Sequence, residues 1–213
     1  MYTAAAGMAA QQDRLDAVAG DLANVSTTGY KHARLAFRDL VYTQGAHGNP
    51  NVSVGAGAAA TSLGPSTLQG ALQTTEEPLD VALVGPGFIA IRDAAGRPAQ
   101  TRDGHLRLDD RGRLTTARGE LLDPPVALPP GTQPQDISIA PDGTVSVAGR
   151  AYGGVRVIGP RTTRLEQGAL EASNVDIGDA MTSMIEAQRG FELASKAIEV
   201  QDQMLQIANQ VKR

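Results

Sequence analysis

Few residues of this chain have the type and spacing that bind a metal or support catalysis. The three histidines, His32, His47 and His105, are scattered, and none lies at a metal-ligand spacing from another histidine or from a carboxylate. The chain has no cysteine, so it offers neither a thiolate metal site nor a disulfide framework. We therefore expect each histidine on the surface or in a loop, and we predict no metal site.

The carboxylates are numerous but single out no acid–base pair. The chain has 23 Asp and Glu residues, and the runs at 109–112 and 141–143 are explained by hairpin turns, which favour Asp and Gly. Residues 55–57 (GAG) resemble the start of a dinucleotide-binding loop but lack its third glycine and its strand–helix setting. With 3% aromatic residues, no substrate pocket is indicated. An enzyme is the weakest hypothesis, and no cofactor is predicted.

Composition narrows the class of partner. The net charge is −4, and the sequence contains no run of Lys or Arg, which argues against nucleic acid as the main partner. No apolar stretch approaches the ~20 residues that span a bilayer, so no membrane insertion is expected. Polar residues 11–14 interrupt the first apolar stretch early, and no Sec-type signal is visible.

The strongest pattern lies in residues 174–211, where apolar residues mark two seams of one predicted helix. Both seams have spacings of three and four, which are typical of a helix that packs along a partner helix. The first comprises Ile177, Ala180, Met184, Ala187, Phe191, Ala194, Ile198, Gln201, Leu205 and Ala208. The second comprises Leu193, Ala197, Val200, Met204, Ile207 and Val211.

The two seams face apart and predict two partners. At about 100° per residue, Leu193 lies roughly 200° from Phe191. A surface helix needs only one apolar stripe, and this helix would be ~57 Å long, against a diameter of ~26 Å for a 100-residue domain. The alternative is a helix enclosed in one large core.

The pattern of residues 3–25 predicts a second amphipathic helix, which is rich in alanine. Met8, Leu15 and Leu22 repeat every seven residues, and Val18 and Val25 follow the last two of them three positions later. The pattern ends at residues 24–29 (NVSTTG), where Gly29 can adopt a positive φ. We expect this helix to pair with the C-terminal one, antiparallel or staggered.

The middle of the chain, residues 31–165, reads as all-β. Turn signals at 95–96, 110–112, 118–119 and 141–143 separate the strand-like runs, and residues 44–70 read as a flexible or irregular connector. Ser173 or Asn174 is the expected N-cap of the long helix. The predicted strands are 81–84, 88–91, 105–108, 137–139, 145–147 and 155–158.

Two charge pairs are expected on the long helix. Glu192 and Lys196 are spaced i,i+4, and Glu186 and Arg189 are spaced i,i+3. They would be either solvent-exposed pairs with little effect on stability or contacts that fix the register between subunits.

Four ordered segments resemble the signatures of the bacterial flagellar basal-body rod protein family. Residues 19–31 (AGDLANVSTTGYK) resemble its N-terminal signature, and 78–83 with 87–88 its first core strand. Residues 101–106 with 109 and 112–115 resemble its central β signature. Residues 167–176 (QGALEASNVD) resemble its C-terminal motif, which continues onto the helix. The distal-rod and proximal-rod subtypes both remain open, because the β region runs almost directly from residue 158 into the C-terminal motif.

The resemblance implies an α+β protein whose terminal helices form a coiled-coil layer around a central, mostly antiparallel all-β domain. The expected division is 1–28 plus 172–213 for helical assembly, 29–75 as connector and 76–171 as β domain. The implied function is a structural, non-enzymatic subunit of the periplasmic rod, self-assembling into a helical tube that transmits torque and surrounds the export channel.

The implied partners are further copies of the chain, other axial proteins of rod and hook, and the flagellar export apparatus. A monomeric β-domain binding module on a helical stalk is the alternative. The predicted assembly interface comprises Met8, Leu15, Val18, Leu22, Asn24, Val25, Gly29, Tyr30, Ile177, Met184, Phe191, Leu193, Ile198, Val200, Met204, Leu205, Ile207 and Val211.

Overall fold

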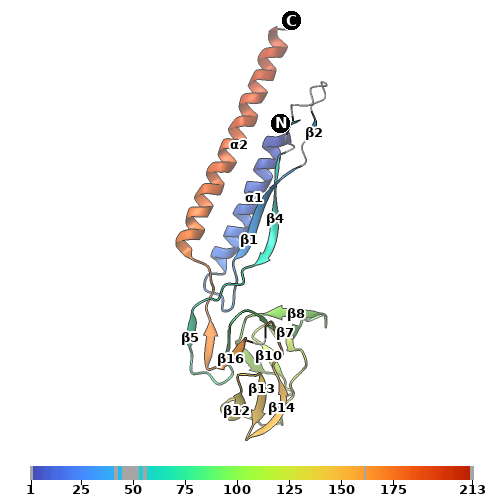
Figure 1. Ribbon diagram of the computed structural model, residues 1–213, viewed down its shortest axis with the longest axis vertical. Helices are drawn as coiled ribbons and strands as arrows, with labels where there is room; N and C mark the ends of the chain where they lie inside the picture. Colours follow the sequence, from blue (N-terminus) through green and yellow to red (C-terminus); the bar gives the residue numbers. More distant parts are fainter. Residues whose placement is uncertain (1, 41–42, 45–52, 55–56, 161, 212–213) are drawn as a thin grey trace. The chain divides into compact units, whose positions relative to one another are not determined.

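The computed structural model describes residues 2–40, 43–44, 53–54, 57–160 and 162–211. These residues form two compact units. The helical unit contains the described parts of 1–23, 33–66 and 176–213, and the β unit contains 24–32 and 67–175. The α+β class is confirmed, because helices from the two ends of the chain pack together and the strands pair antiparallel (Figure 1).

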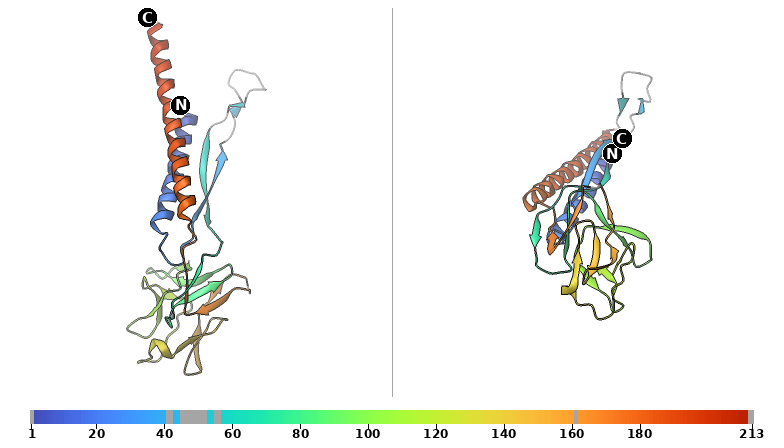
Figure 2. Two further views of the ribbon diagram at one scale, coloured as in Figure 1. Left: turned by 90° about the vertical axis from the view of Figure 1, so that its left-hand side faces the viewer. Right: turned by 60° about the horizontal axis from the view of Figure 1, so that its bottom comes forward.

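Both predicted helices are present in the helical unit. α1 spans Tyr2–Ala23 and α2 spans Ile177–Val211, and the two run antiparallel side by side (Figures 1 and 2). The expected N-cap is wrong: the carboxylate of Asp176 accepts a hydrogen bond from the backbone N–H of Asp179 at 3.1 Å, and its carbonyl accepts one from Ala180. Asp176 therefore caps α2. No helix within the described residues is both long and apolar enough to cross a membrane.

Small side chains line the contact between the two helices. Ala10 of α1 and Ala180 and Ala187 of α2 are all buried. Because alanine adds little thickness to a helix, it permits a close approach of the two axes. At the edge of the contact, Arg14 donates to a carboxylate oxygen of Glu186 at 2.8 Å. Both side chains of this pair are partly exposed, so it contributes little to stability.

A two-stranded ribbon completes the helical unit. β1 (Ala33–Asp39) pairs with β4 (Ala58–Pro65), and both strands contact α1, which lies between α2 and the ribbon in Figure 1. The expectation of an irregular connector over 44–70 is therefore wrong for Ala58–Pro65. This stretch has weak strand propensity, and its pairing and its contact with α1 override that preference. Within the same stretch, 45–52 and 55–56 lie outside the described residues. β2 (Thr43–Gln44) pairs with β3 (Ser53–Val54).

The β unit consists of antiparallel sheets joined mainly by short turns. A six-stranded sheet has the order β15–β7–β11–β10–β9, with β8 also paired to β7. β12, β13 and β14 form a three-stranded sheet, and β16 pairs with β6 and β17 with β5. The strands are β5 (Leu72–Thr74), β6 (Val81–Val84), β7 (Phe88–Arg92), β8 (Pro98–Thr101), β9 (Leu106–Leu108), β10 (Leu114–Thr116), β11 (Leu121–Leu122), β12 (Ile137–Ile139), β13 (Thr144–Val147), β14 (Arg150–Gly154), β15 (Val157–Ile158), β16 (Arg164–Gln167) and β17 (Ala169–Glu171), with a 3₁₀ turn at Pro134–Asp136.

The core of the β unit is aliphatic and joins the larger sheets. It comprises Val81, Leu83, Ile89, Ile91, Leu106, Leu114, Leu122, Val126, Leu128, Ile137, Ile139, Val145, Val155 and Leu165. The predicted strands at 81–84, 88–91, 105–108, 137–139 and 145–147 are confirmed within one or two residues. The prediction at 155–158 is correct only for Val157–Ile158, because Val155 is a buried core residue outside any strand.

Truncation of a core leucine should destabilise the β unit without changing the fold. Leu114 is fully buried on β10, so Leu114→Ala removes apolar contacts and leaves a cavity that costs about 2–5 kcal/mol. Leu68→Ala is the matched control, since Leu68 is 69% exposed. Chemical denaturation of both variants measures the difference. Equal unfolding free energies for the two would contradict the assignment of Leu114 to the core.

Candidate assembly interface

The first apolar seam of α2 is partly covered within the chain. Ala180 and Ala187 are buried and Met184 and Ile198 are half-buried, and α2 contacts α1 within the helical unit. The seam opens at both ends, where Ile177 and Leu205 are exposed. α2 has 35 residues and α1 has 22, and the C-terminal end of α2 extends past α1 in Figure 1. Between Ile177 and Leu205 along the helix, the side chain of Phe191 is 36% exposed and thus only partly covered.

The second seam of α2 has no cover within the described chain. Leu193 is 68% exposed, Met204 64% and Ile207 60%, and Val200 and Ala197 are exposed as well. Val211 closes the helix, and its side chain lies outside the described residues. Large apolar side chains that line up on one exposed face mark a surface that binds another molecule.

The interface residues predicted from the N-terminal segment fall into two groups. Met8, Leu15, Val18 and Leu22 lie on α1 and are half-buried. Asn24, Val25, Gly29 and Tyr30 instead lie in the turn that follows α1, within the β unit. The carbonyl of Asn24 accepts a hydrogen bond from Thr27, and the carbonyl of Tyr30 accepts one from Asn174.

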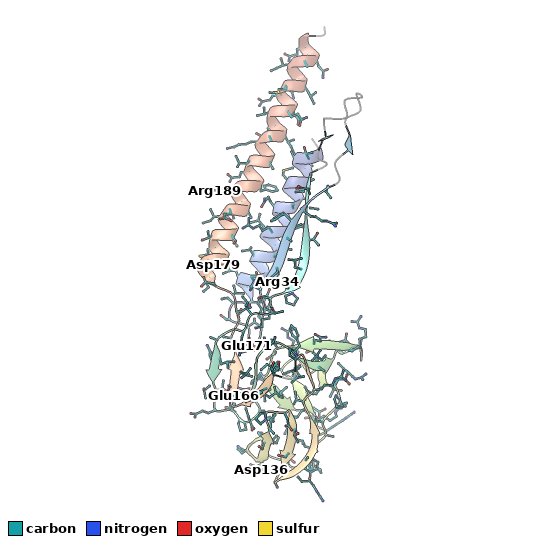
Figure 3. The ribbon with its side chains drawn as sticks, viewed as in Figure 1. Arg34, Asp136, Glu166, Glu171, Asp179 and Arg189 are labelled. Atoms are coloured by element: carbon teal, nitrogen blue, oxygen red, sulfur yellow. The ribbon has the colours of Figure 1, made fainter. Side chains whose placement is uncertain are left out.

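The charge pairs expected along α2 differ from those in the structure. Glu186 pairs with Arg14 of α1 rather than with Arg189, and within the described part of the chain no ion pair joins Glu192 to Lys196. Figure 3 shows Arg189 on the side of α2 that faces away from α1. The basic residues of α2 are thus available to groups outside the chain.

A buried ion cluster lies in the β unit, where the segments that lead to the two helices meet. The Lys31 ammonium donates to Oε1 of Glu171 at 2.5 Å and to the carbonyl oxygen of Leu68. The backbone N–H of Gly70 donates to the same Oε1 at 2.7 Å. Nε of Arg102 lies 3.1 Å from Oε2 of Glu171, without the alignment of a hydrogen bond, so this contact is an ion pair only. Figure 3 labels Glu171 in this region.

Burial sets the electrostatics of the cluster. The three charged side chains, those of Lys31, Arg102 and Glu171, are each at most 4% exposed. Burial lowers the pKa of Lys31, and the contact with Glu171 partly offsets this effect. Burial also lowers the pKa of Arg102, again against the attraction of Glu171. Two cations therefore share one carboxylate, and each depends on it because an unpaired buried charge is strongly unfavourable.

Backbone pairing reinforces the cluster. The N–H of Gly29 donates to the carbonyl of Glu171 at 2.7 Å, and the N–H of His32 donates to the side chain of Asn174 at 2.8 Å. Gly29 has φ +67°, and a Cβ at this position would overlap the carbonyl of Arg102. The predicted positive φ of Gly29 is thus confirmed, and the close approach adds a second reason for glycine.

The cluster was not predicted from the sequence. Lys31, Arg102 and Glu171 are distant along the chain, and no local spacing relates them. A signal was nevertheless available, because each lies inside a different signature segment, at 19–31, 101–106 or 167–176. Charged residues in otherwise apolar or turn-forming signatures are candidates for mutual pairing.

The histidine expectation also needs correction at one position. Nδ1 of His105 lies 2.6 Å from a carboxylate oxygen of buried Asp80, and the two residues form an isolated β-bridge. His105 thus belongs to a polar pair that joins two backbone segments rather than to a free loop. The contact was not visible in the sequence because the two residues are far apart along the chain.

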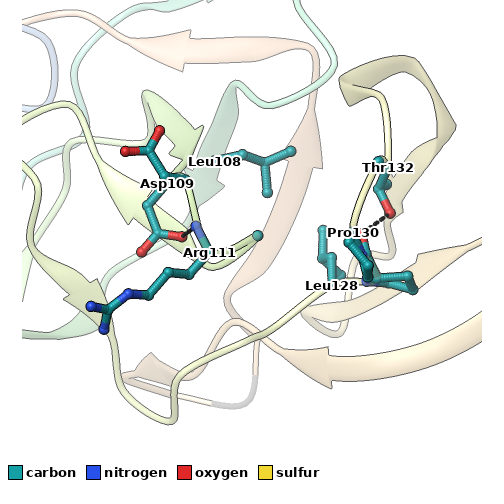
Figure 4. A pocket seen from close by; sticks show the side chains of 10 residues that line it. Leu108, Asp109, Arg111, Leu128, Pro130 and Thr132 are labelled. Atoms are coloured by element: carbon teal, nitrogen blue, oxygen red, sulfur yellow. Dashed lines mark hydrogen bonds between the residues drawn. The ribbon is translucent and has the colours of Figure 1, made fainter.

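A shallow pocket of about 350 Å³ lies between the β9–β10 turn and residues 128–132 (Figure 4). Its most prominent acid, Asp109, is fully engaged: Oδ1 accepts from the backbone of Arg111 and Arg113, and Oδ2 accepts from the guanidinium of Arg113. The backbone bond from Arg113 is the main cause of a lowered pKa of Asp109. Asp109 therefore stabilises its turn, as the sequence predicts.

The same turn chemistry recurs at Asp142, whose carboxylate accepts from the backbone N–H of Thr144 at 2.9 Å. This bond lowers the pKa of Asp142. Asp93 accepts from the backbone of Ala95 and Arg97 in the same way. The turn signals at 95–96, 110–112, 118–119 and 141–143 all lie at hairpin turns of the structure, which confirms them.

Three parts of the chain match described protein families. Residues 1–31 match "Flagella basal body rod protein", residues 82–147 match "Flagellar hook protein FlgE/F/G D1 domain", and residues 166–211 match "Flagellar basal body rod FlgEFG protein C-terminal". The chain is also similar over its whole length to proteins named "Flagellar basal-body rod protein FlgG". These include proteins from Borreliella burgdorferi (35% identical), Caulobacter vibrioides (33%) and Bacillus subtilis (30%), with 100% of this chain and 98% of each relative covered.

The chain belongs to the flagellar basal-body rod protein family. It is a structural, non-enzymatic protein of the flagellar basal-body rod. Family membership favours this function over a stalked binding module and over an enzyme. The alignment with the Borreliella relative spans 260 positions, whereas this chain has 213 residues. The relative therefore carries segments that have no counterpart in this rod protein.

The three family matches meet at the buried cluster. Lys31 is the last residue of the N-terminal match, Arg102 lies in the central match and Glu171 in the C-terminal match. Each matched region of the rod protein thus contributes one charge. The cluster joins the three regions, and it holds together the segments that precede α2 and follow α1.

Removal of the shared carboxylate should weaken the β unit strongly. Glu171→Gln leaves Lys31 and Arg102 buried without a counter-charge, at a cost of about 3–5 kcal/mol. Glu166→Gln, at an exposed position of β16, is the matched control and should stay near the wild-type stability. Thermal and denaturant unfolding measure both. A near-neutral Glu171→Gln variant would contradict the proposed dependence on this carboxylate.

The lowered pKa of the turn residue Asp109 predicts a loss of stability in acid. Because folding lowers the pKa of Asp109 below its ordinary value of 3.8, the unfolded chain binds this proton first as the pH falls. Stability from this group is present above pH 3.8, and it decreases as the pH falls through the folded pKa. Asp109→Asn keeps the Oδ1 acceptor for the backbone of Arg111 and Arg113, loses the acceptor for the Arg113 guanidinium and no longer titrates, so its unfolding free energy should vary less over this acid range. An unchanged pH profile would contradict the prediction.

Proposed function

We propose that this rod protein polymerises through its terminal helices into a helical tube that surrounds the export channel and transmits torque from the motor to the hook. The observation that carries the proposal is the open second seam of α2, which extends from Leu193 to Ile207 and has no partner within the described chain. Burial of each large apolar side chain there contributes about 1.5–3 kcal/mol. Neighbouring subunits are the partners that a rod protein has available.

The interface residues predicted from the sequence are part of this proposal. Segments 1–28 and 172–213 form the assembly domain, and the half-buried seam of α1 and the partly covered first seam of α2 hold the two helices as a pair. The second seam and the open end of the first, at Leu205, then contact other subunits. The turn residues Asn24, Gly29 and Tyr30 support this assembly indirectly, because they lie in the segment that leads out of α1.

The proposal includes the wider partners. Other axial proteins of the rod and hook would continue the tube at its ends, and the flagellar export apparatus would deliver the chain to the periplasm. We assign the distal-rod, FlgG-like subtype, because the relatives that align over the full chain carry the name FlgG. No cofactor, nucleic acid or membrane insertion is part of this function.

A charge placed on the second seam should block assembly and leave the fold intact. Val200 is 50% exposed in the single chain, so Val200→Asp should change monomer stability by less than about 0.5 kcal/mol. In an assembled rod the same charge would be desolvated, and incorporation into basal bodies should be lost. Phe191→Asp should also block incorporation. The measurement is immunoblotting of isolated basal bodies from a strain that carries only the variant.

The matched control is Gln206→Asp, which adds the same charge at an exposed position of α2 on the side away from the second seam. Circular dichroism and denaturation check that each variant remains folded. Normal rods from the Val200→Asp strain would contradict burial of the second seam between subunits.

A further inference from the structure

The helical unit has a second open face, on α1, that differs in character from the open seam of α2. Apart from one glutamine, the exposed residues of this face are alanine or aspartate, and their spacing places them on one side of the helix. They are Ala5, Ala9, Gln12, Asp13, Asp16, Ala19 and Ala23. The face is therefore shallow, and its only charges are negative.

The open face of α1 carries exposed acidic residues, whereas the exposed basic residues of the two helices lie on α2. Arg14, the only basic residue of α1, is bound to Glu186 within the chain. This contact leaves Asp13 and Asp16 as the exposed charges of α1, and Asp16 accepts a hydrogen bond from Gln12. The open face of α1 therefore attracts basic groups.

The open seam of α2 has the complementary pattern. Arg189 and Lys196 are the only basic residues of α2 and both are exposed. At about 100° per residue, both lie within roughly 60° of the line through Leu193 and Val200, on the same flank of the seam. The seam thus combines a ridge of large apolar side chains with a basic border.

We propose that the open seam of α2 in one copy packs on the open face of α1 in a second copy, with Arg189 and Lys196 facing Asp13 and Asp16. This pairing rests on the proposed function and specifies which two surfaces meet. Large side chains such as Leu193 and Met204 fill the shallow face that the alanines leave, and opposite charges fix the register. The exposed apolar residues Ile177, Met181 and Ile185 form a second stripe of α2, which lies on the other side of the basic border from the seam and leads into Arg189 at the same spacing of four residues.

The pairing has a consequence for symmetry. Because the donor seam and the acceptor face are different surfaces of the same unit, the contact is heterologous. Each copy can offer its α2 seam to one neighbour and its α1 face to another. Such contacts propagate into a ring or an open helical array rather than stop at a dimer.

Engineered disulfides test the pairing directly, because the chain has no cysteine of its own. Val200→Cys is combined in turn with Ala5→Cys, Ala9→Cys and Ala19→Cys, which sample the register along α1. Within one copy these positions face away from each other, so a disulfide, which needs Cα atoms within about 7 Å, requires two copies. Oxidation of basal bodies that contain the variants should give a ladder of covalent multimers on a non-reducing gel for at least one pair.

The matched control replaces Val200→Cys by Gln206→Cys, which is exposed about 120° around α2 from Val200, on the side away from the seam. No ladder is expected from its combinations with the same three α1 positions. A ladder from the Gln206 set, or none from the Val200 set although the variants are present in the basal bodies, would overturn the pairing. Absence of the unsubstituted chain from basal bodies would instead overturn the proposed function, so the two failures are distinguishable.

Charge reversal gives an independent readout. Asp13→Lys with Asp16→Lys, and separately Arg189→Glu with Lys196→Glu, should each reduce incorporation by about tenfold or more, because like charges would meet. All four changes in one chain restore opposite charges in every contact and should restore incorporation. Arg38→Glu, on the exposed part of β1, is the control for charge reversal elsewhere in the unit. Lack of rescue, with all variants folded by circular dichroism, would overturn the pairing.

Discussion

The long helix α2 carries more apolar surface than its partner in the same chain can cover, and this imbalance governs the helical unit. α1 has 22 residues and α2 has 35, so even a fully matched antiparallel pair leaves the end of α2 without a neighbour. From Leu193 to Ile207 the second seam has no cover within the described chain. A structural protein that functions only as part of a polymer can tolerate such surface, because assembly removes it from water.

The β unit holds together two segments that come from opposite ends of the chain. Closure of so long a loop has an entropic cost, which the contacts between these segments must offset. The aliphatic core contributes most of the stabilisation. The cluster around Glu171 determines how the segments align with one another. One carboxylate must satisfy Lys31, Arg102 and the N–H of Gly70. A slip of any of these segments would leave a buried charge without a partner, so the cluster favours a single arrangement.

Much of the fold follows from local sequence patterns. The three-and-four spacing of α2 predicted both seams, and the structure covers one of them in part with α1 and leaves the other exposed. The Asp–Gly turns predicted the hairpin boundaries, because one side chain and one glycine determine each turn. β4 was missed because Ala58–Pro65 lacks strand propensity and forms a strand only through its pairing with β1 and its contact with α1. The ion cluster and the Asp80–His105 pair were missed because they are long-range contacts.

The most direct test of the central claim is hydrogen–deuterium exchange of α2 in the isolated chain and in assembled basal bodies. Amides near Leu205, which have no covering partner in the single chain, should exchange rapidly when the chain is alone. In the assembled rod they should be protected by about 100-fold or more. Strong protection of these amides in a dilute, monomeric chain would contradict the claim that neighbouring subunits cover this part of α2.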